Sequence, residues 1–178
     1  MPWKIIILFG ALPIAAYWLG RYVFYQKSQA RIGQTDCRLT VEDYAKKLSY
    51  EGKIPRSLAG KRTASALAEI SLAAAYARLK VDHPQPVKIR LRADTWSQVV
   101  LPFSIIIAVI AIIAMRPPVV CIATAVVVNA VVAVMKFTSR GVAKHAADRA
   151  IHLMRGARIP LAGDESTIEA CIRSLTWK

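Results

Sequence analysis

Residues 99–137 read VVLPFSIIIAVIAIIAMRPPVVCIATAVVVNAVVAVMKF, and this stretch decides the fold. No charged residue lies within 99–115 or within 119–135. A hydrocarbon core about 30 Å thick is crossed by roughly 20 apolar helical residues. Arg116-Pro117-Pro118 separates the two runs, and proline ends a helix because it lacks an N–H donor and restricts the preceding residue. The stretch therefore predicts two membrane helices joined by a very short turn. The alternative is a buried helix pair in a soluble protein, which needs a larger core than 178 residues supply.

A further apolar segment occupies residues 1–24. Its central part, 5–20, is uncharged, and aromatic residues such as Trp3 and Trp18 lie near its ends, as is typical of membrane interfaces. A cleaved signal peptide is the alternative, because a lysine precedes the apolar part and small residues occur near Ala15. We expect an uncleaved N-terminal anchor.

The charge distribution predicts the orientation of these segments. The chain carries 25 Lys and Arg against 11 Asp and Glu, a formal net charge of +14. Of the 25 cations, 23 lie in residues 21–97 and 136–178, whereas only Lys4 and Arg116 lie on the other side of the predicted spans. Since positive flanking segments remain inside, we expect a multi-pass protein of the cytoplasmic (inner) membrane, with its N-terminus outside and its C-terminus cytoplasmic.

The same cations suggest partners for the cytoplasmic segments. Basic segments next to a bilayer attract anionic lipid headgroups, so these are one expected partner. The basic segments lack the interleaved aromatic residues that bind single-stranded nucleic acid, so no nucleic-acid partner is expected.

The sequence thus predicts an all-α membrane protein with three transmembrane helices, one N-terminal anchor plus a helical hairpin, and a small helical cytoplasmic part. Its expected regions are an anchor at 1–24, cytoplasmic helices at 25–97, the transmembrane hairpin at 98–137 and cytoplasmic C-terminal helices at 138–178.

Within the first cytoplasmic region, Thr40 is expected to cap a helix that continues to Gly52. Asp43 lies three residues after Thr40, which resembles a capping box. The alanine-rich stretch 63–82 favours a second helix, which we expect Pro84 and Pro86 to end.

Two readings are open for residues 87–97, VKIRLRADTWS. Alternating apolar and basic residues match the period of a strand, whereas a basic strip beside anionic headgroups fits equally well. Further along, an amphipathic helix is expected after residue 137, then a loop at 156–163 and a last helix from Asp164 or Ser166.

The sequence offers few groups for catalysis. His145 and His152 are seven residues apart, which separates them by about 10 Å along a helix, too far for one metal ion. No H-E-x-x-H motif occurs, and the three cysteines lack metal-binding spacing. We therefore expect no metal and no cofactor. One alternative is a haem or chlorophyll ligated by His145 or His152. Another is a metal-independent catalytic site formed by Tyr76, His83 and His145.

Several short motifs resemble the YugP-type neutral zinc metallopeptidases, a family of membrane proteins. Ile70-Ser71-Leu72-Ala73 is similar to the start of that family's zinc-binding helix, and Ala146, Arg149 and Ala150 are similar to its A-S-x-R-A segment. The N-terminal anchor, Thr40 with Asp43 and Ala45, and the final Leu175-Thr176-Trp177 add to the resemblance.

The resemblance implies a zinc site that this sequence does not supply. The positions that match the two zinc histidines are Ala75 and Leu79, the position of the general base is Tyr76, and the third ligand position is Ala143. Catalytic zinc needs three protein ligands and a base that reaches the bound water. We therefore expect a catalytically inactive pseudo-peptidase that acts as an accessory or assembly subunit of a larger membrane protein complex. Alternatives are a zinc-independent or trans-completed peptidase, and a cofactor-contacting subunit of a respiratory or photosynthetic complex.

Overall fold

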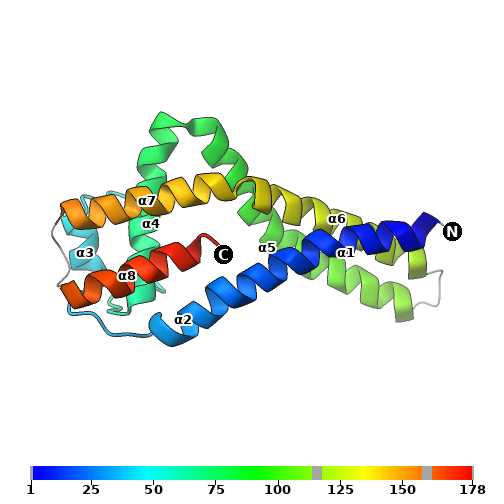
Figure 1. Cartoon of the computed structure of the whole chain (residues 1–178), viewed down its shortest axis with the longest axis horizontal. Helices are drawn as coiled ribbons and strands as arrows, with labels where there is room; N and C mark the ends of the chain where they lie inside the picture. Colours follow the sequence, from blue (N-terminus) through cyan, green and yellow to red (C-terminus); the bar gives the residue numbers. More distant parts are fainter. Residues whose placement is uncertain (1, 114–117, 158–161, 178) are drawn as a thin grey trace. The chain divides into compact units, whose positions relative to one another are not determined.

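A computed structural model describes residues 2–113, 118–157 and 162–177. Most of these residues are helical and no strand lies among them, so the expected all-α class is confirmed for the described part; one isolated β-bridge joins Asp36 and Thr63. The helices are α1 (Pro2–Gly20), the π-helix η1 (Arg21–Gln26), α2 (Lys27–Ile32), α3 (Val41–Lys47), α4 (Ala64–Asp82), α5 (Pro84–Ile113), α6 (Pro118–Thr138), α7 (Arg140–Gly156) and α8 (Ala162–Leu175) (Figure 1).

The strand reading of residues 87–97 is wrong, because these residues belong to α5. Proline is well suited to the first position of a helix, so Pro84 starts α5 after α4 has ended at Asp82. The buried residues Arg90 and Ala93 are three apart, a helical spacing that the short alternation of the sequence had obscured. Of the predicted turn Arg116-Pro117-Pro118, the first two residues lie outside the described residues, and Pro118 begins α6.

The chain divides into two compact units, Met1–Leu19 with Lys88–Ser139, and Gly20–Val87 with Arg140–Lys178. The first unit contains α1, most of α5 and α6. Within the described residues, one helix is long and apolar enough to cross a membrane, at Val120–Thr138, with a mean hydropathy of 2.2. Only 17% of that segment is buried inside the protein.

Small and polar residues bring the helices of the first unit together. A Cβ added to Gly10 of α1 would lie 2.6 Å from Val126 Cγ1 of α6, so glycine permits this close approach. Asn129 of α6 donates from Nδ2 to Ser104 Oγ of α5 at 2.7 Å. A hydrogen bond of this kind between apolar helices supports their association.

An ion cluster of Arg90, Asp94 and Lys136 connects α5 with α6. Asp94 lies 3.3 Å from Arg90 Nε and 3.3 Å from Lys136 Nζ, and the side chains of these two cations are only 5% and 4% exposed. Lys136 also donates to Tyr17 Oη of α1 at 3.1 Å. Buried cations are tolerated where a carboxylate and further hydrogen bonds compensate them, so this ion cluster joins all three helices of the unit.

In the second unit, the ends of α3 follow local rules. Thr40 caps the helix as expected, with its Oγ1 accepting from Asp43 N at 3.3 Å and donating to the Asp43 carboxylate at 2.7 Å. The predicted end at Gly52 is wrong, because the helix stops at Lys47. Ser49 has a φ of +52°, and Tyr50 N donates to Ala45 O at 3.0 Å. This is a Schellman ending, with serine where glycine is usual.

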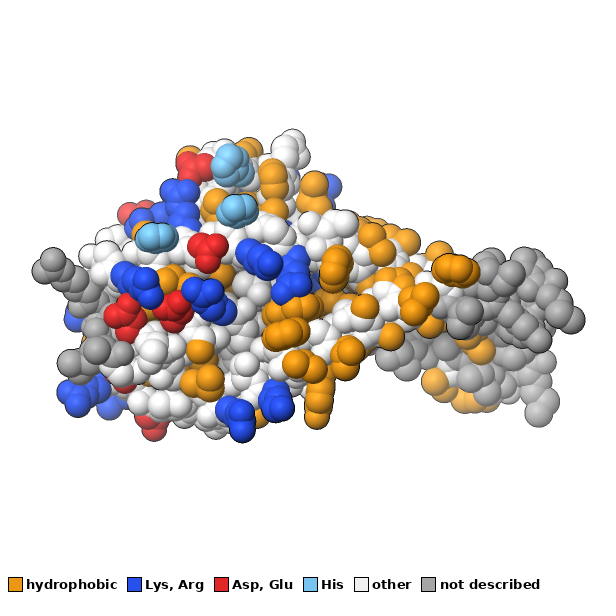
Figure 2. Space-filling model, in the orientation of Figure 1, with side chains coloured by type: hydrophobic (Ala, Val, Ile, Leu, Met, Phe, Trp, Pro, Cys, Tyr) orange, Lys and Arg blue, Asp and Glu red, His pale blue; other side chains and the backbone are white. Residues whose placement is uncertain are grey.

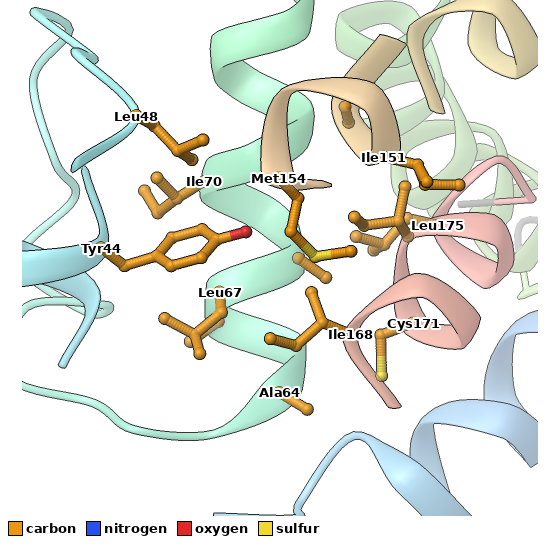
Figure 3. Packing of buried hydrophobic residues seen from close by; sticks show 14 of the residues in the cluster. Tyr44, Leu48, Ala64, Leu67, Ile70, Ile151, Met154, Ile168, Cys171 and Leu175 are labelled. Atoms are coloured by element: carbon orange, nitrogen blue, oxygen red, sulfur yellow. The ribbon is translucent and has the colours of Figure 1, made fainter. Parts of the chain in front are cut away.

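The core of the second unit forms around α4. Figure 3 shows Tyr44 of α3 beside Leu67 and Ile70 of α4, with Met154 of α7 and residues of α8 completing the cluster. These side chains are all buried. Alanines on α4 and α7 let the helices approach closely, because a methyl group occupies little space between two backbones.

Helices α7 and α8 are joined by ion pairs at the surface. Arg155 of α7 contacts Glu165 at 2.9 Å and Glu169 at 2.7 Å. The predicted loop 156–163 lies partly outside the described residues, and α8 begins at Ala162, two residues before the expected Asp164. On the face seen in Figure 2, acidic and basic side chains intermingle over the helices of the second unit.

Candidate functional site

The positions that correspond to the peptidase ligands lie in the packed core. Ala75 is 0% exposed on α4 and Ala143 is 1% exposed on α7. Leu79 is buried in a small apolar cluster with Ala146, and Tyr76 packs against the same cluster while remaining partly exposed. Methyl and isobutyl groups cannot ligate zinc, and the buried Ala75, Leu79 and Ala143 act in helix packing.

Two of the three histidines line one cavity of about 360 Å³. His83 follows α4 and His145 lies on α7, and Arg149 beside them forms an ion pair with Asp82 at 2.7 Å. The structure thus brings together two members of the proposed metal-independent site, with Tyr76 in the adjoining apolar cluster. His152 does not line this cavity. Within the described residues, no three His, Cys, Asp or Glu side chains gather to hold a metal ion.

A second cavity, of about 410 Å³, is basic and aromatic; we call it the basic cavity. It is built by η1, α2, α7 and α8 of the second unit. Three cations and one carboxylate lie in its wall. Its residues are Phe24, Ser28, Arg140, Lys144, Ala147, Asp148, Ala170, Arg173, Ser174, Thr176 and Trp177.

Trp177 organises the aromatic wall of the basic cavity. Its ring stacks on Phe24 with centroids 4.7 Å apart and an interplanar angle of 10°. The Arg140 guanidinium carbon lies 3.3 Å from the centroid of the Trp177 ring, a cation–π contact. A Cβ on Gly20 would lie 2.2 Å from Cζ3 of Trp177, so only glycine leaves room for this ring.

The cations of the basic cavity differ in how they are compensated. Arg173 is paired with Glu169 at 2.8 Å, and Glu169 also binds Arg155. In contrast, Lys144 makes no ion pair within the described residues. Arg140 Nε is buried with no hydrogen-bond partner there, and burial lowers the pKa of this guanidinium. An anion in this cavity would therefore meet two cations without an ion pair among the described residues, Arg140 and Lys144, with Asp148 as the carboxylate in the wall.

Hydroxyl groups complete the wall. Ser174 Oγ accepts from Gln29 Nε2 at 3.0 Å and donates to Cys171 O at 2.8 Å, which fixes α8 against α2. Thr176 donates to Arg173 O at 2.8 Å. These bonds shape the end of α8 and hold Trp177 at the cavity.

Sequence reasoning counted Arg140 and Lys144 only as charges that set orientation, and it used Trp177 only as part of a motif. It did not predict that they would line one cavity. The available signal was a tryptophan near the end of the chain together with cations spaced four apart, Arg140 and Lys144.

Comparison of the chain with family models, curated proteins and solved structures finds no match. The likeness to YugP-type metallopeptidases therefore depends on the short motifs alone and stays a hypothesis.

Proposed function

We propose that this chain is a three-span membrane protein without peptidase activity, which serves as an accessory or assembly subunit of a larger membrane protein complex. In this proposal α1, the apolar part of α5 and α6 cross the inner membrane. The apolar residues that these helices expose, such as Phe9, Phe103 and Val131, support contact with lipid or with partner helices. The charge bias of 23 cations to two supports an outside N-terminus and a cytoplasmic second unit.

One observation carries the non-catalytic part of the proposal. The positions of the would-be zinc ligands are occupied by apolar side chains, and Ala75 and Ala143 are fully packed in the core. Inserting a histidine and a metal ion there would disrupt the packing of α4 against its neighbours, because cores do not accommodate large added groups cheaply. A scaffold of this kind supports binding rather than hydrolysis.

Deleting the gene for this chain and separating the solubilised membrane complexes on native gels tests the assembly role. We expect one membrane complex to be lost or to migrate as a smaller form, with recovery on re-expression of the full chain. Crosslinking mass spectrometry in native membranes would then identify the neighbouring subunits. An unchanged set of complexes would overturn the proposal.

A second candidate function is a site completed by a partner, favoured by His83 and His145 lining one cavity. Two imidazoles provide two of the three or four protein ligands that zinc sites use. Elemental analysis of the complex, isolated with wild-type chain or with His83→Ala, tests this candidate. His152→Ala is the matched control, because His152 is exposed and lies outside that cavity. Zinc that is lost in His83→Ala but kept in His152→Ala would favour a site completed by a partner. A visible absorption band of the complex would instead favour a subunit that contacts haem or chlorophyll.

A further inference from the structure

The basic cavity lies within a short chain distance of the predicted membrane segments. Arg140 is the second residue after α6 ends at Thr138, and Gly20 ends α1 four residues before Phe24. Two residues of extended chain span at most about 7 Å, whatever the arrangement of the two units. The polar headgroup layer on each side of a bilayer is roughly 6 Å deep. If α6 crosses the membrane as proposed, Arg140 is therefore held at headgroup depth.

The wall of the basic cavity has the chemistry of a phosphate site. A guanidinium offers a planar set of N–H donors and an ammonium offers a point charge, and both bind phosphate oxygens. Arg140 and Lys144 supply one of each, with Arg173 nearby. An anion beside Arg140 would also offset the cost of burying that guanidinium.

The aromatic wall fits the remainder of a lipid headgroup. The stacked rings of Phe24 and Trp177 present apolar surface next to the cations. Tryptophan is enriched at membrane–water interfaces, where one end of its ring is wet and the other is apolar. The volume of about 410 Å³ lies in the range of small-molecule sites, roughly 300 to 1,000 Å³.

We propose that the basic cavity, through Arg140, Lys144 and the Trp177 ring, binds the phosphodiester headgroup of one anionic phospholipid. This inference depends on the proposed membrane crossing and is independent of the identity of the partner complex. The bound lipid would link α7 and α8 to the bilayer surface and so hold the second unit against the membrane.

Native mass spectrometry of the full chain in detergent tests the proposal. The purified protein is offered equal amounts of phosphatidylglycerol and phosphatidylcholine with the same acyl chains. We expect one phosphatidylglycerol to be retained in preference to phosphatidylcholine. Replacing both cations, in R140Q/K144Q, should weaken retention about 25-fold, and K144Q alone about fivefold, since each surface cation near an anionic lipid contributes about 1 kcal/mol, or roughly a factor of five.

The matched control is K61Q/R62Q, which removes two exposed cations from the second unit outside the basic cavity. Equal loss in K61Q/R62Q and R140Q/K144Q would overturn the site, because diffuse charge would then explain binding. Because Arg140 also contacts Trp177, unchanged thiol labelling of the buried Cys171 checks that each variant is folded.

A further arm adds inorganic phosphate at increasing concentration. If the lipid is displaced only when the phosphate concentration far exceeds that of the lipid, a lipid is supported as the occupant. Tight phosphate binding with no preference among lipids would overturn the lipid proposal. A chain that fails to fractionate with membranes would refute the proposed function itself. A chain that inserts normally but shows no preference for phosphatidylglycerol would refute this inference alone.

Discussion

The buried pair Tyr44–Ser71 permits a quantitative test of how the second unit is stabilised. The two hydroxyl oxygens are 2.6 Å apart, and Ser71 Oγ also donates its proton to Leu67 O at 3.0 Å. Since the serine proton is engaged there, the Tyr44 hydroxyl is the donor within the pair. Burial raises the pKa of Tyr44 to about 12, so this donor stays protonated at neutral pH.

The expected costs of substitution are unequal. Ser71→Ala leaves the Tyr44 hydroxyl buried without its acceptor, which we expect to cost about 2 kcal/mol of unfolding free energy. Tyr44→Phe removes the donor but leaves Ser71 bonded to Leu67, so its cost is about 1 kcal/mol. The double variant removes both polar groups together and should also cost about 1 kcal/mol, well below the sum of the two single effects.

Two native thiols report the opening of this core. Cys37 and Cys171 belong to the same buried cluster as Tyr44, and burial raises the pKa of each thiol to about 11. At pH 8 they should react with a maleimide only when the core opens. The assay uses the full chain in detergent, with Cys121 changed to serine so that only these two thiols are labelled.

Because 1.4 kcal/mol corresponds to a factor of ten, Ser71→Ala should speed labelling about 30-fold and Tyr44→Phe about fivefold. The double variant should also be about fivefold faster than the parent. Ser57→Ala is the control, since Ser57 is exposed in the same unit, and its labelling rate should not change. A double variant that is faster by the product of the two single effects would refute the pairing.

Three further predictions concern other contacts. Ser49→Gly should stabilise the second unit by about 1 kcal/mol, because glycine adopts a φ of +52° without strain, and unchanged thiol labelling would contradict this. Asp94→Asn should lower the unfolding free energy in detergent by about 3 kcal/mol, because it leaves buried cations uncompensated. Adding Lys136→Met to that variant should restore part of the lost stability, and a further loss of stability would contradict the role of the ion cluster. Hydrogen bonding from Arg173 lowers the pKa of Glu169, so this carboxylate stabilises the fold above its ordinary pKa of 4.5 and its contribution is lost as pH falls through the lowered folded value. Unfolding measurements should therefore give a difference in unfolding free energy of about 1 kcal/mol between wild type and Glu169→Gln at pH 7. This difference should close as pH falls below 4.5 and through the lowered pKa, whereas a constant difference would show that the charge is irrelevant.

Local chemistry explains why part of the fold was predictable. Thr40 caps α3 because its side chain bonds to an N–H only three residues away. The prolines after Asp82 separate α4 from α5 by their covalent geometry. Contacts of this kind depend on neighbouring residues, so reading the chain in order is sufficient to find them.

The errors arose where local signals conflict. The strand pattern of residues 87–97 was outweighed by a helix that continues through them into the apolar run. The end of α3 at Lys47 was missed because serine, here Ser49, rarely adopts a positive φ, and Gly52 looked like the better signal. In both cases the surrounding helix packing overrides a weak local preference.

By itself, the sequence determined the helical class, the long uncharged runs and the placement of most cations between them. These properties depend on composition and spacing along one chain. Only the tertiary structure decided that Arg140 and Lys144 share a cavity with Phe24 and Trp177, and that Ala75 and Ala143 are packed in the core. Phe24 and Trp177 are more than 150 residues apart, and no local sequence pattern predicts that their rings stack. This stacking follows from how the helices of the second unit bury their apolar faces together.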